Sequence, residues 1–498
     1  MADNLQKQEA DQKARKALLW FASSSVIWQA CSWIFTIYLA RILLPEDYGV
    51  MALAGSFHPY LLILVTLRLE LWLVQREEVN QRVERTAFTL IFILSSLVSL
   101  FCLTAAGEVA GFLEDERVKD VFLVMALSFI FKGASAVPEA KLKRDLNFKP
   151  IALMNLSIGF LRQVVTVILA LKGYGYWALM IGQLIGDFLS AVWLNVASPV
   201  KYGFLFEKSL IKEALKFGAY TAGGLIFWAG GTKIDDLLVG KMLGANFLGF
   251  YTMAYMLAEL PLSKMNAFVS SILLSYYSKL KQDSEVLLKA YLDVSRGMSL
   301  IIVPGLIGMA IVSPEMIPIL IGEKWRPIVP MFQVMCGIWS LISCVDQVSR
   351  LLLAMGRANL LFYISAINFT ILGLSFYFGL SWFGEKGLYY TWLTAYPLTV
   401  LVSGKFVNIA TGIGAWRYIK NYSITFISVA VMAAVTWSYR EFMLGRISDL
   451  LLLISTILVG GATYILTLRV LFYEEALRVY RMVRHGPQVK EEEAIATA

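Results

Sequence analysis

Charged side chains stand inside several long apolar stretches of this chain, where they could bind ions or anionic groups. The run from Phe247 to Tyr277 is typical, because Glu259 and Lys264 lie near its middle. A charge at bilayer depth costs at least about 2.5–3.5 kcal/mol on insertion scales, so such residues usually face a polar cavity within a helical bundle. The pattern therefore indicates a transporter and raises the question of what its cavity holds.

The composition is that of a membrane protein. Of the 498 residues, 58% are hydrophobic and only 16% are charged, whereas soluble proteins carry about 25% charged residues. Apolar runs of about 20 residues, each able to cross about 30 Å of hydrocarbon as a helix, recur along the chain. The connections between them are too short for a soluble catalytic domain. The net charge of +8 is explained by basic cytoplasmic loops and does not indicate a nucleic-acid partner.

We predict an all-α polytopic membrane protein with about fourteen transmembrane helices. The predicted spans are 17–40, 48–74, 87–107, 118–138, 151–171, 176–197, 217–239, 247–277, 293–313, 330–355, 360–380, 387–409, 421–439 and 448–471. With this count, 27 of the 44 lysines and arginines fall on the side of the termini and ten on the other side. The positive-inside rule then predicts cytoplasmic termini in the cell (inner) membrane.

The chain also contains an internal repeat with an offset of 200 residues. The segment Ala40–Gly49, which leads out of one predicted span, corresponds to Gly240–Gly249. Three identical positions, Leu43, Gly49 and Ala54, recur as Leu243, Gly249 and Ala254. Six spans separate the copies, so the repeat is parallel and predicts two facing six-helix lobes with a central site. The expected domains are a cytoplasmic leader (1–16), an N-lobe (17–213), a C-lobe (214–410), two further helices (411–472) that look like an appendage, and a cytoplasmic tail (473–498).

A series of short motifs follows in order over residues 20–410. They are Ala40–Gly49, Leu73–Arg76 with Ala87–Phe88, Val137–Ala140 with Arg144–Phe148, Gly175–Leu179, and Asp236–Gly240 continuing to Gly249–Tyr251, Ala254–Tyr255 and Leu260–Pro261. Together they resemble the oligosaccharide flippases of the multidrug/oligosaccharidyl-lipid/polysaccharide exporter superfamily, most closely its WzxC-like lipopolysaccharide-biosynthesis branch. Ser275 departs from that pattern, where proline is frequent, and so do Arg68 and Glu70, where small apolar residues are usual.

The resemblance implies a cargo and a cavity. The cargo would be a polyprenyl-pyrophosphate-linked oligosaccharide, moved from the inner to the outer leaflet for cell-surface polysaccharide assembly. The cavity would be V-shaped and lined chiefly by the spans near 17–40, 48–74, 217–239 and 247–277. Membrane lipids, and polysaccharide polymerase or glycosyltransferase machinery, are the partners it implies. No cofactor or metal is expected, and a coupling ion, H+ or Na+, is left open.

Three basic residues on these spans are candidates for the pyrophosphate and sugar site: Arg68, Lys233 and Lys264. Arginine could bind phosphate bidentately and lysine as a point charge. Lys264 has a structural pairing as its alternative, although Glu259, five residues away, lies about 140° round the helix. Arg68 could instead reach the interface. Glu70 is about 200° from it, so the two are not expected to pair.

The acids within the spans have two interpretations. Glu70, Asp235, Asp236 and Glu259 could line the cavity or bind a coupling ion, while Lys233 and Asp236 are spaced for a local pair. Lys132 and Lys405 lie near span ends and are expected to reach the interface. Two further pairs of structural type are expected. They are Arg162 with Asp187 and Asp346 with Arg350. No catalytic residues are predicted.

Two other functions compete with a flippase. A small-molecule (drug or metabolite) antiporter of the same superfamily would depend on acids more than on bases. A membrane-embedded polysaccharide polymerase or ligase would need a sizeable outer loop that carries reactive groups. The longest expected outer loops, Gly107–Val118 and Ser313–Pro330, are short and contain no histidine, so an enzyme is the least favoured of the three.

Overall fold

The computed structural model describes residues 31–473 except 199, 201, 202 and 281. The predicted leader 1–16, residues 17–30 of the first predicted span, and the predicted tail from residue 474 lie outside the described residues. Every regular element within the described residues is a helix. The fold is therefore all-α, as predicted.

Twelve helices among the described residues are long and apolar enough to cross a membrane. One of them, α9 (Lys208–Leu280), covers two of the predicted spans. The shorter apolar helix Cys31–Ile42 is the described part of the first predicted span. The helices thus account for the predicted spans, and the chain is a multi-pass membrane protein.

The helices group into two compact units. The first consists of the described residues up to Met253 together with Ser365–Leu388, and the second of Ala254–Ile364 and the described residues from Tyr389. This grouping assigns α9 up to Met253 to the first unit, whereas the predicted C-lobe begins at residue 214. The boundaries of the predicted lobes therefore stay a prediction. The first unit holds Cys31–Ile42, α2 (Pro45–Gly55), α3 (His58–Thr66), α4 (Leu69–Gln75), α5 (Gln81–Leu113), α6 (Arg117–Arg144), α7 (Lys149–Leu171), α8 (Tyr176–Ala197), the beginning of α9 and most of α13 (Ala358–Phe383).

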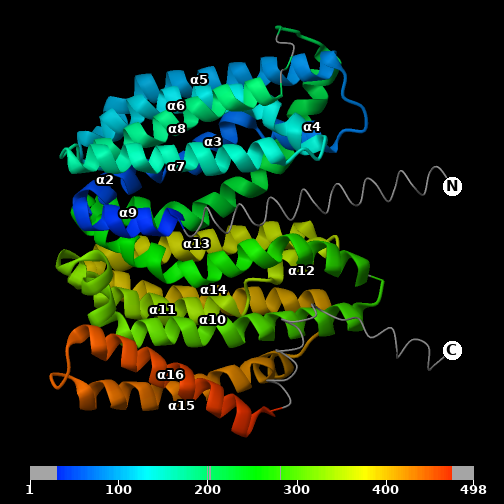
Figure 1. Cartoon of the computed structure of the whole chain (residues 1–498). Helices are drawn as coiled ribbons and strands as arrows, with labels where there is room; N and C mark the ends of the chain where they lie inside the picture. Colours follow the sequence, from blue (N-terminus) through cyan, green and yellow to red (C-terminus); the bar gives the residue numbers. More distant parts are fainter. Residues whose placement is uncertain (1–30, 199, 201–202, 281, 474–498) are drawn as a thin grey trace, which may run out of the picture. The chain divides into compact units, whose positions relative to one another are not determined.

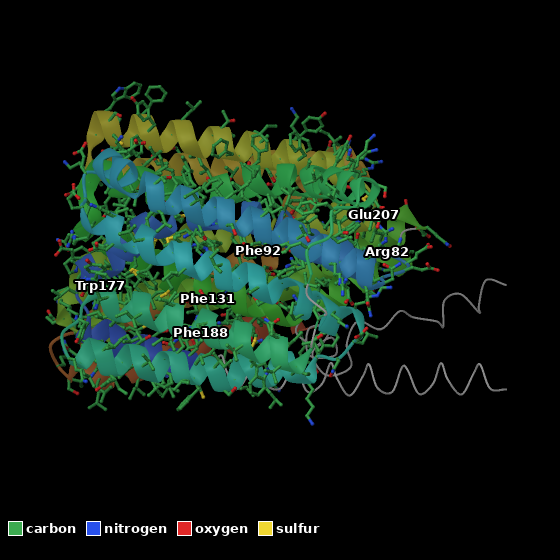
Figure 2. The ribbon with its side chains drawn as sticks, turned by 90° about the horizontal axis from the view of Figure 1, so that it is seen from above. Arg82, Phe92, Phe131, Trp177, Phe188 and Glu207 are labelled. Atoms are coloured by element: carbon green, nitrogen blue, oxygen red, sulfur yellow. The ribbon has the colours of Figure 1, made fainter. Side chains whose placement is uncertain are left out.

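In the first unit, α5 to α8 are long helices that lie side by side (Figure 1). Figure 2 shows Arg82, at the start of α5, and Trp177, at the start of α8, at opposite ends of these helices. The rings of Phe131 and Phe188 meet at 5.2 Å and bring α6 against α8. Asn80 caps α5 by accepting hydrogen bonds from two backbone N–H groups, a contribution of about 1 kcal/mol.

α9 turns back on itself at Gly244, which has a φ of 84°. A hydroxyl hydrogen bond of 2.5 Å joins Tyr251 to Asp235, 16 residues earlier. In a straight helix these residues would lie about 24 Å apart. Gly244 therefore separates two antiparallel helical segments, and a positive φ at this position suits glycine.

The second unit contains the remaining helices: the rest of α9, α10 (Ser284–Ile321), η1 (Glu323–Ile328), α11 (Val329–Ser343), α12 (Val348–Ala354), α14 (Glu385–Thr411), α15 (Ala415–Met443) and α16 (Asp449–Leu471). α15 and α16, the two helices outside the predicted repeat, both pack on α10, and the Tyr464 hydroxyl of α16 donates to the Leu300 carbonyl of α10. The side chains of Arg296 and Asn421 are hydrogen-bonded, as are those of Ser299 and Thr425.

A buried ion pair also fastens α15 to α10. Arg440 donates from Nε and Nη2 to both oxygens of Glu315, at 3.1 and 2.6 Å. We expected residues 313–330 to form an outer loop, and this was wrong because α10 continues to Ile321. The expected loop 107–118 is likewise mostly helical, because α5 ends at Leu113 and α6 begins at Arg117.

Candidate functional site

The first candidate residues lie where a predicted span is broken. Leu67 and Arg68 separate α3 from α4, and both adopt the left-handed conformation, with φ of 45° and 58°. Such a conformation costs about 1–3 kcal/mol at a residue other than glycine. Gly218 of α9 lies against the break, because a Cβ there would be 2.6 Å from the Leu67 carbonyl oxygen.

The break brings Arg68 and Glu70 together. Arg68 Nη1 lies 3.4 Å from Glu70 Oε1, so the expectation that they could not pair was wrong: it assumed a continuous helix. The pair is incompletely satisfied. Arg68 Nε and Glu70 Oε2 are buried and have no hydrogen-bond partner among the described residues, which leaves capacity for a further polar group.

α4 is also fastened to the beginning of α9. Trp72 Nε1 donates to Glu213 Oε1 at 3.1 Å, and Arg76 Nη1 donates to the same oxygen. These bonds hold α4 just beyond the break, so the position of Arg68 is fixed from both sides. Glu213 was not a candidate from sequence because it lies in the basic segment before the predicted span.

The second group of candidates lies on α9. Lys233 Nζ and Asp236 Oδ2 are 2.6 Å apart, which confirms the expected local pair. Asp235 is only 2% exposed. Its Oδ2 accepts from Tyr251, while its Oδ1 has no hydrogen-bond partner among the described residues. Asp235 is therefore a buried carboxylate with one oxygen available to a proton or a cation.

A third charged group surrounds Asp187 on α8. Lys132 Nζ lies 2.6 Å from Asp187 Oδ1, so Lys132, which was expected to reach the interface, forms an ion pair within the first unit. Ser128 and Gln183 also donate to the Asp187 carboxylate. Arg162 was expected to pair directly with Asp187, but its Nη1 donates to Gln183 Oε1 at 2.9 Å. The Arg162–Asp187 link is therefore indirect, through the Gln183 amide.

His58, at the start of α3, lies within reach of two of these groups. The charges of Lys132, Asp187 and Lys233 all act on its imidazole, and its ring stacks on Phe129 at 5.5 Å. Sequence reasoning gave His58 no role, because a single histidine in an apolar stretch carries no recognisable spacing. The first unit thus contains ionisable side chains within α3, α6, α8 and α9, of which Asp187, Asp235 and Asp236 are buried.

The remaining candidates belong to the second unit. Glu259 and Lys264 lie half-buried on α9. Arg350 Nη1 and Asp346 Oδ2 are 3.2 Å apart, which confirms the predicted pair. The buried Gln347 side chain donates to Asp346 and to Asn266 of α9.

This second polar group also lies at a helix break, between α11 and α12. Val348 N donates to the Val345 carbonyl. The Cys344 carbonyl accepts instead from the hydroxyl groups of Tyr418 and Tyr422 on α15. The tyrosines satisfy a backbone group that the break frees, as a membrane interior requires.

Comparison with known proteins identifies the family of this chain. The family described as "Polysaccharide biosynthesis protein" matches residues 38–330, more than half of the chain. The chain belongs to this family. The teichuronic acid biosynthesis protein TuaB of Bacillus subtilis (strain 168) is 26% identical over 310 residues, 61% of this chain and 64% of TuaB. The lipopolysaccharide biosynthesis protein WzxC of Escherichia coli (strain K12) is 23% identical over 69% of this chain and 70% of its own length.

Solved structures agree on the fold of this polysaccharide biosynthesis protein. The inward closed conformation of the lipid II flippase MurJ aligns with a TM-score of 0.74 at 15% identity, covering 92% of this chain and 99% of MurJ. An inward-facing multidrug resistance MATE family transporter of the MOP superfamily aligns with a TM-score of 0.59 at 12% identity, covering 76% of this chain and 94% of that transporter. The fold is therefore MurJ/MATE-like, as the sequence motifs predicted.

Proposed function

We propose that this protein flips a polyprenyl-pyrophosphate-linked oligosaccharide from the inner to the outer leaflet of the cell membrane by alternating access, for cell-surface polysaccharide assembly. Two observations, the family and the fold, together support the proposal. The chain belongs to a polysaccharide biosynthesis family, and its fold aligns over 92% of its length with that of a lipid II flippase. Polysaccharide polymerases or glycosyltransferases would then be its working partners, and both termini would be cytoplasmic.

The charged groups supply a way to bind and release such a cargo. Arg68 and Lys233 each have an in-chain carboxylate as partner. A cation without a partner at membrane depth would be costly, and these pairs keep the unloaded site neutral. A pyrophosphate with several negative oxygens could replace the carboxylates, and the carboxylates could recover the cations on release. In this proposal Arg68, Lys233 and Lys264 are the basic residues that contact the cargo.

A coupling ion is the second part of the proposal. Asp235 combines burial with an available oxygen, which suits a proton or Na+. A proton would remove the charge of the carboxylate, and Na+ would compensate it. The same feature favours the alternative function, a small-molecule antiporter, because MATE transporters share the fold. A polymerase or ligase is supported by none of the charged groups described above, which are paired within the helices rather than gathered on a loop.

A reconstitution experiment tests the proposal. The full-length protein is placed in proteoliposomes that contain a fluorescent pyrophosphate-linked oligosaccharide lipid. A membrane-impermeant reductant then reports how much of that lipid reaches the opposite leaflet. We expect faster transfer than in protein-free liposomes, and no acceleration for a phospholipid with the same fluorophore. No transfer of several such glycolipids, together with efflux of a small organic cation, would replace the flippase by the antiporter.

A further inference from the structure

The two copies of the internal repeat touch each other at equivalent positions. A Cβ on Gly49 of α2 would lie 1.6 Å from the carbonyl oxygen of Ala245. A Cβ on Gly249 of α9 would lie 1.8 Å from the carbonyl oxygen of Pro45. In the repeat with its offset of 200 residues, Pro45 is equivalent to Ala245 and Gly49 to Gly249. The two contacts are therefore equivalent to each other.

A contact of this kind is self-complementary, like the interface of a two-fold symmetric dimer. It therefore lies where an axis relating the two repeats would pass. Burial supports the same equivalence at five positions of this segment, where both members of the pair are buried. The pairs are Leu39 and Val239, Ala40 and Gly240, Pro45 and Ala245, Gly49 and Gly249, and Leu53 and Met253.

The contact is made by backbone. At each glycine, the α-hydrogen that replaces the missing Cβ points at a carbonyl oxygen of the other repeat, the geometry of a weak Cα–H···O bond. Small residues spaced four apart, Pro45 with Gly49 and Ala245 with Gly249, permit this approach. The two backbones lie close together at this contact, but the bonds between them are weak. A small separation of the helices therefore breaks the contact at little cost in free energy.

We propose that the reciprocal contact of Gly49 and Gly249 is the outer seal of the transport path, closed in this structure and opened when the protein releases its cargo outward. The inference rests on the proposed function. Rocking of one parallel repeat against the other around a central site joins equivalent residues at one end of the path in one state and parts them in the other. The loop charges predict that this end is extracytoplasmic. Arg117 fixes the beginning of α2 through Glu46, at 2.7 Å, so that α2 moves together with α6.

Alanine at either glycine tests the seal, because one methyl group cannot fit against a carbonyl oxygen at these distances. Leu53, one turn beyond Gly49, is fully buried, with Cδ1 2.5 Å from the Cβ position of Gly240. In a variant without the native cysteines, Leu53→Cys therefore reports opening through its rate of reaction with a maleimide. Gly49→Ala and Gly249→Ala should each raise this rate roughly tenfold or more, a shift of about 1.4 kcal/mol in the conformational equilibrium.

The matched controls are Gly55→Ala on α2 and Gly223→Ala on α9, where a Cβ would meet nothing within 4 Å. They should leave the labelling rate unchanged. Because the contact is reciprocal, Gly49→Ala and Gly249→Ala should have equal effects on labelling and should both abolish flipping. Unchanged labelling in both variants would overturn the seal. So would the absence of folded protein in both variants, which would identify the contact as permanent core packing.

The labelling measurement is independent of the cargo, so the two proposals can fail separately. Normal flipping with unchanged labelling would remove the seal and keep the flippase. Wild-type protein that flips no glycolipid, combined with faster labelling in both alanine variants, would remove the flippase and support a seal in another transporter of this fold.

Discussion

At the scale of residues, three basic side chains are proposed for the cargo site. Arg68 and Lys233 are held by carboxylates close to them in the chain. Lys264 is half-buried on α9 and lies near the middle of the predicted span 247–277. It is therefore the first basic residue to test.

Replacing Lys264 by alanine should reduce flipping at least about tenfold, the effect of losing about 1.4 kcal/mol of binding to phosphate. The amount of folded protein in the membrane should not change, because the residue is only half-buried. Lys405→Ala, at an exposed lysine of α14, is the matched control. Wild-type flipping by Lys264→Ala would show that the lysine is structural.

Asp235→Asn should uncouple transport from an ion gradient. Asparagine keeps the shape of the side chain and its oxygen can still accept from Tyr251, but it cannot take up a proton or balance Na+. Flipping should lose its dependence on an imposed proton or sodium gradient while passive equilibration continues. The measurement is the initial rate in proteoliposomes with and without each gradient. A gradient response equal to that of the wild type would exclude Asp235 as the coupling site.

At the scale of elements, breaks in helices place the polar groups. The sequence indicated the spans around residues 48–74 and 330–355 because their composition is apolar. It contained no proline or glycine signal at Leu67–Arg68, and the break there depends on contacts with α9. For this reason Arg68 and Glu70 can pair, although two residues at this spacing in a continuous helix lie about 200° apart. Pairs within one turn, such as Lys233–Asp236, were predictable because helix geometry alone determines them.

The Arg440–Glu315 pair should matter for stability, because it is buried between α15 and α10. Glu315→Ala would leave Arg440 without its buried partner, at a cost of about 3–5 kcal/mol. Thermal unfolding of the purified protein in detergent should show a lower midpoint. The double variant Glu315→Leu/Arg440→Met should recover most of the loss, because it removes both charges and restores apolar volume. An unchanged midpoint for Glu315→Ala would show that the pair contributes little.

At the scale of the whole molecule, composition was enough to predict the class of fold. Runs of about 20 apolar residues can cross a bilayer only as helices in a chain of this kind. Partners that are distant in sequence were beyond prediction. The ion pairs Lys132–Asp187 and Glu315–Arg440 form because particular helices are neighbours in the fold. A short stretch of sequence does not contain that information. The repeat was visible in the sequence, but the meeting of its two copies required the structure.

The distribution of loop charges predicts the orientation. A fluorescent protein fused to the C-terminus should fluoresce and alkaline phosphatase fused there should be inactive, because both termini are expected in the cytoplasm. Alkaline phosphatase inserted after Gly445, on the opposite side, should be active. An active C-terminal phosphatase fusion would invert the predicted orientation, and with it the direction assigned to the seal.

The carboxylates that hold Arg68 and Lys233 have a consequence for selectivity. A site whose cations are already neutralised has little long-range attraction for small anions, so inorganic phosphate and nucleotides would have to compete with a tethered carboxylate. A lipid-linked pyrophosphate arrives by diffusion within the membrane and brings the binding energy of its sugars and its tail. The internal acids would then make the protein resistant to inhibition by the abundant phosphates of the cytosol while it remains open to its cargo.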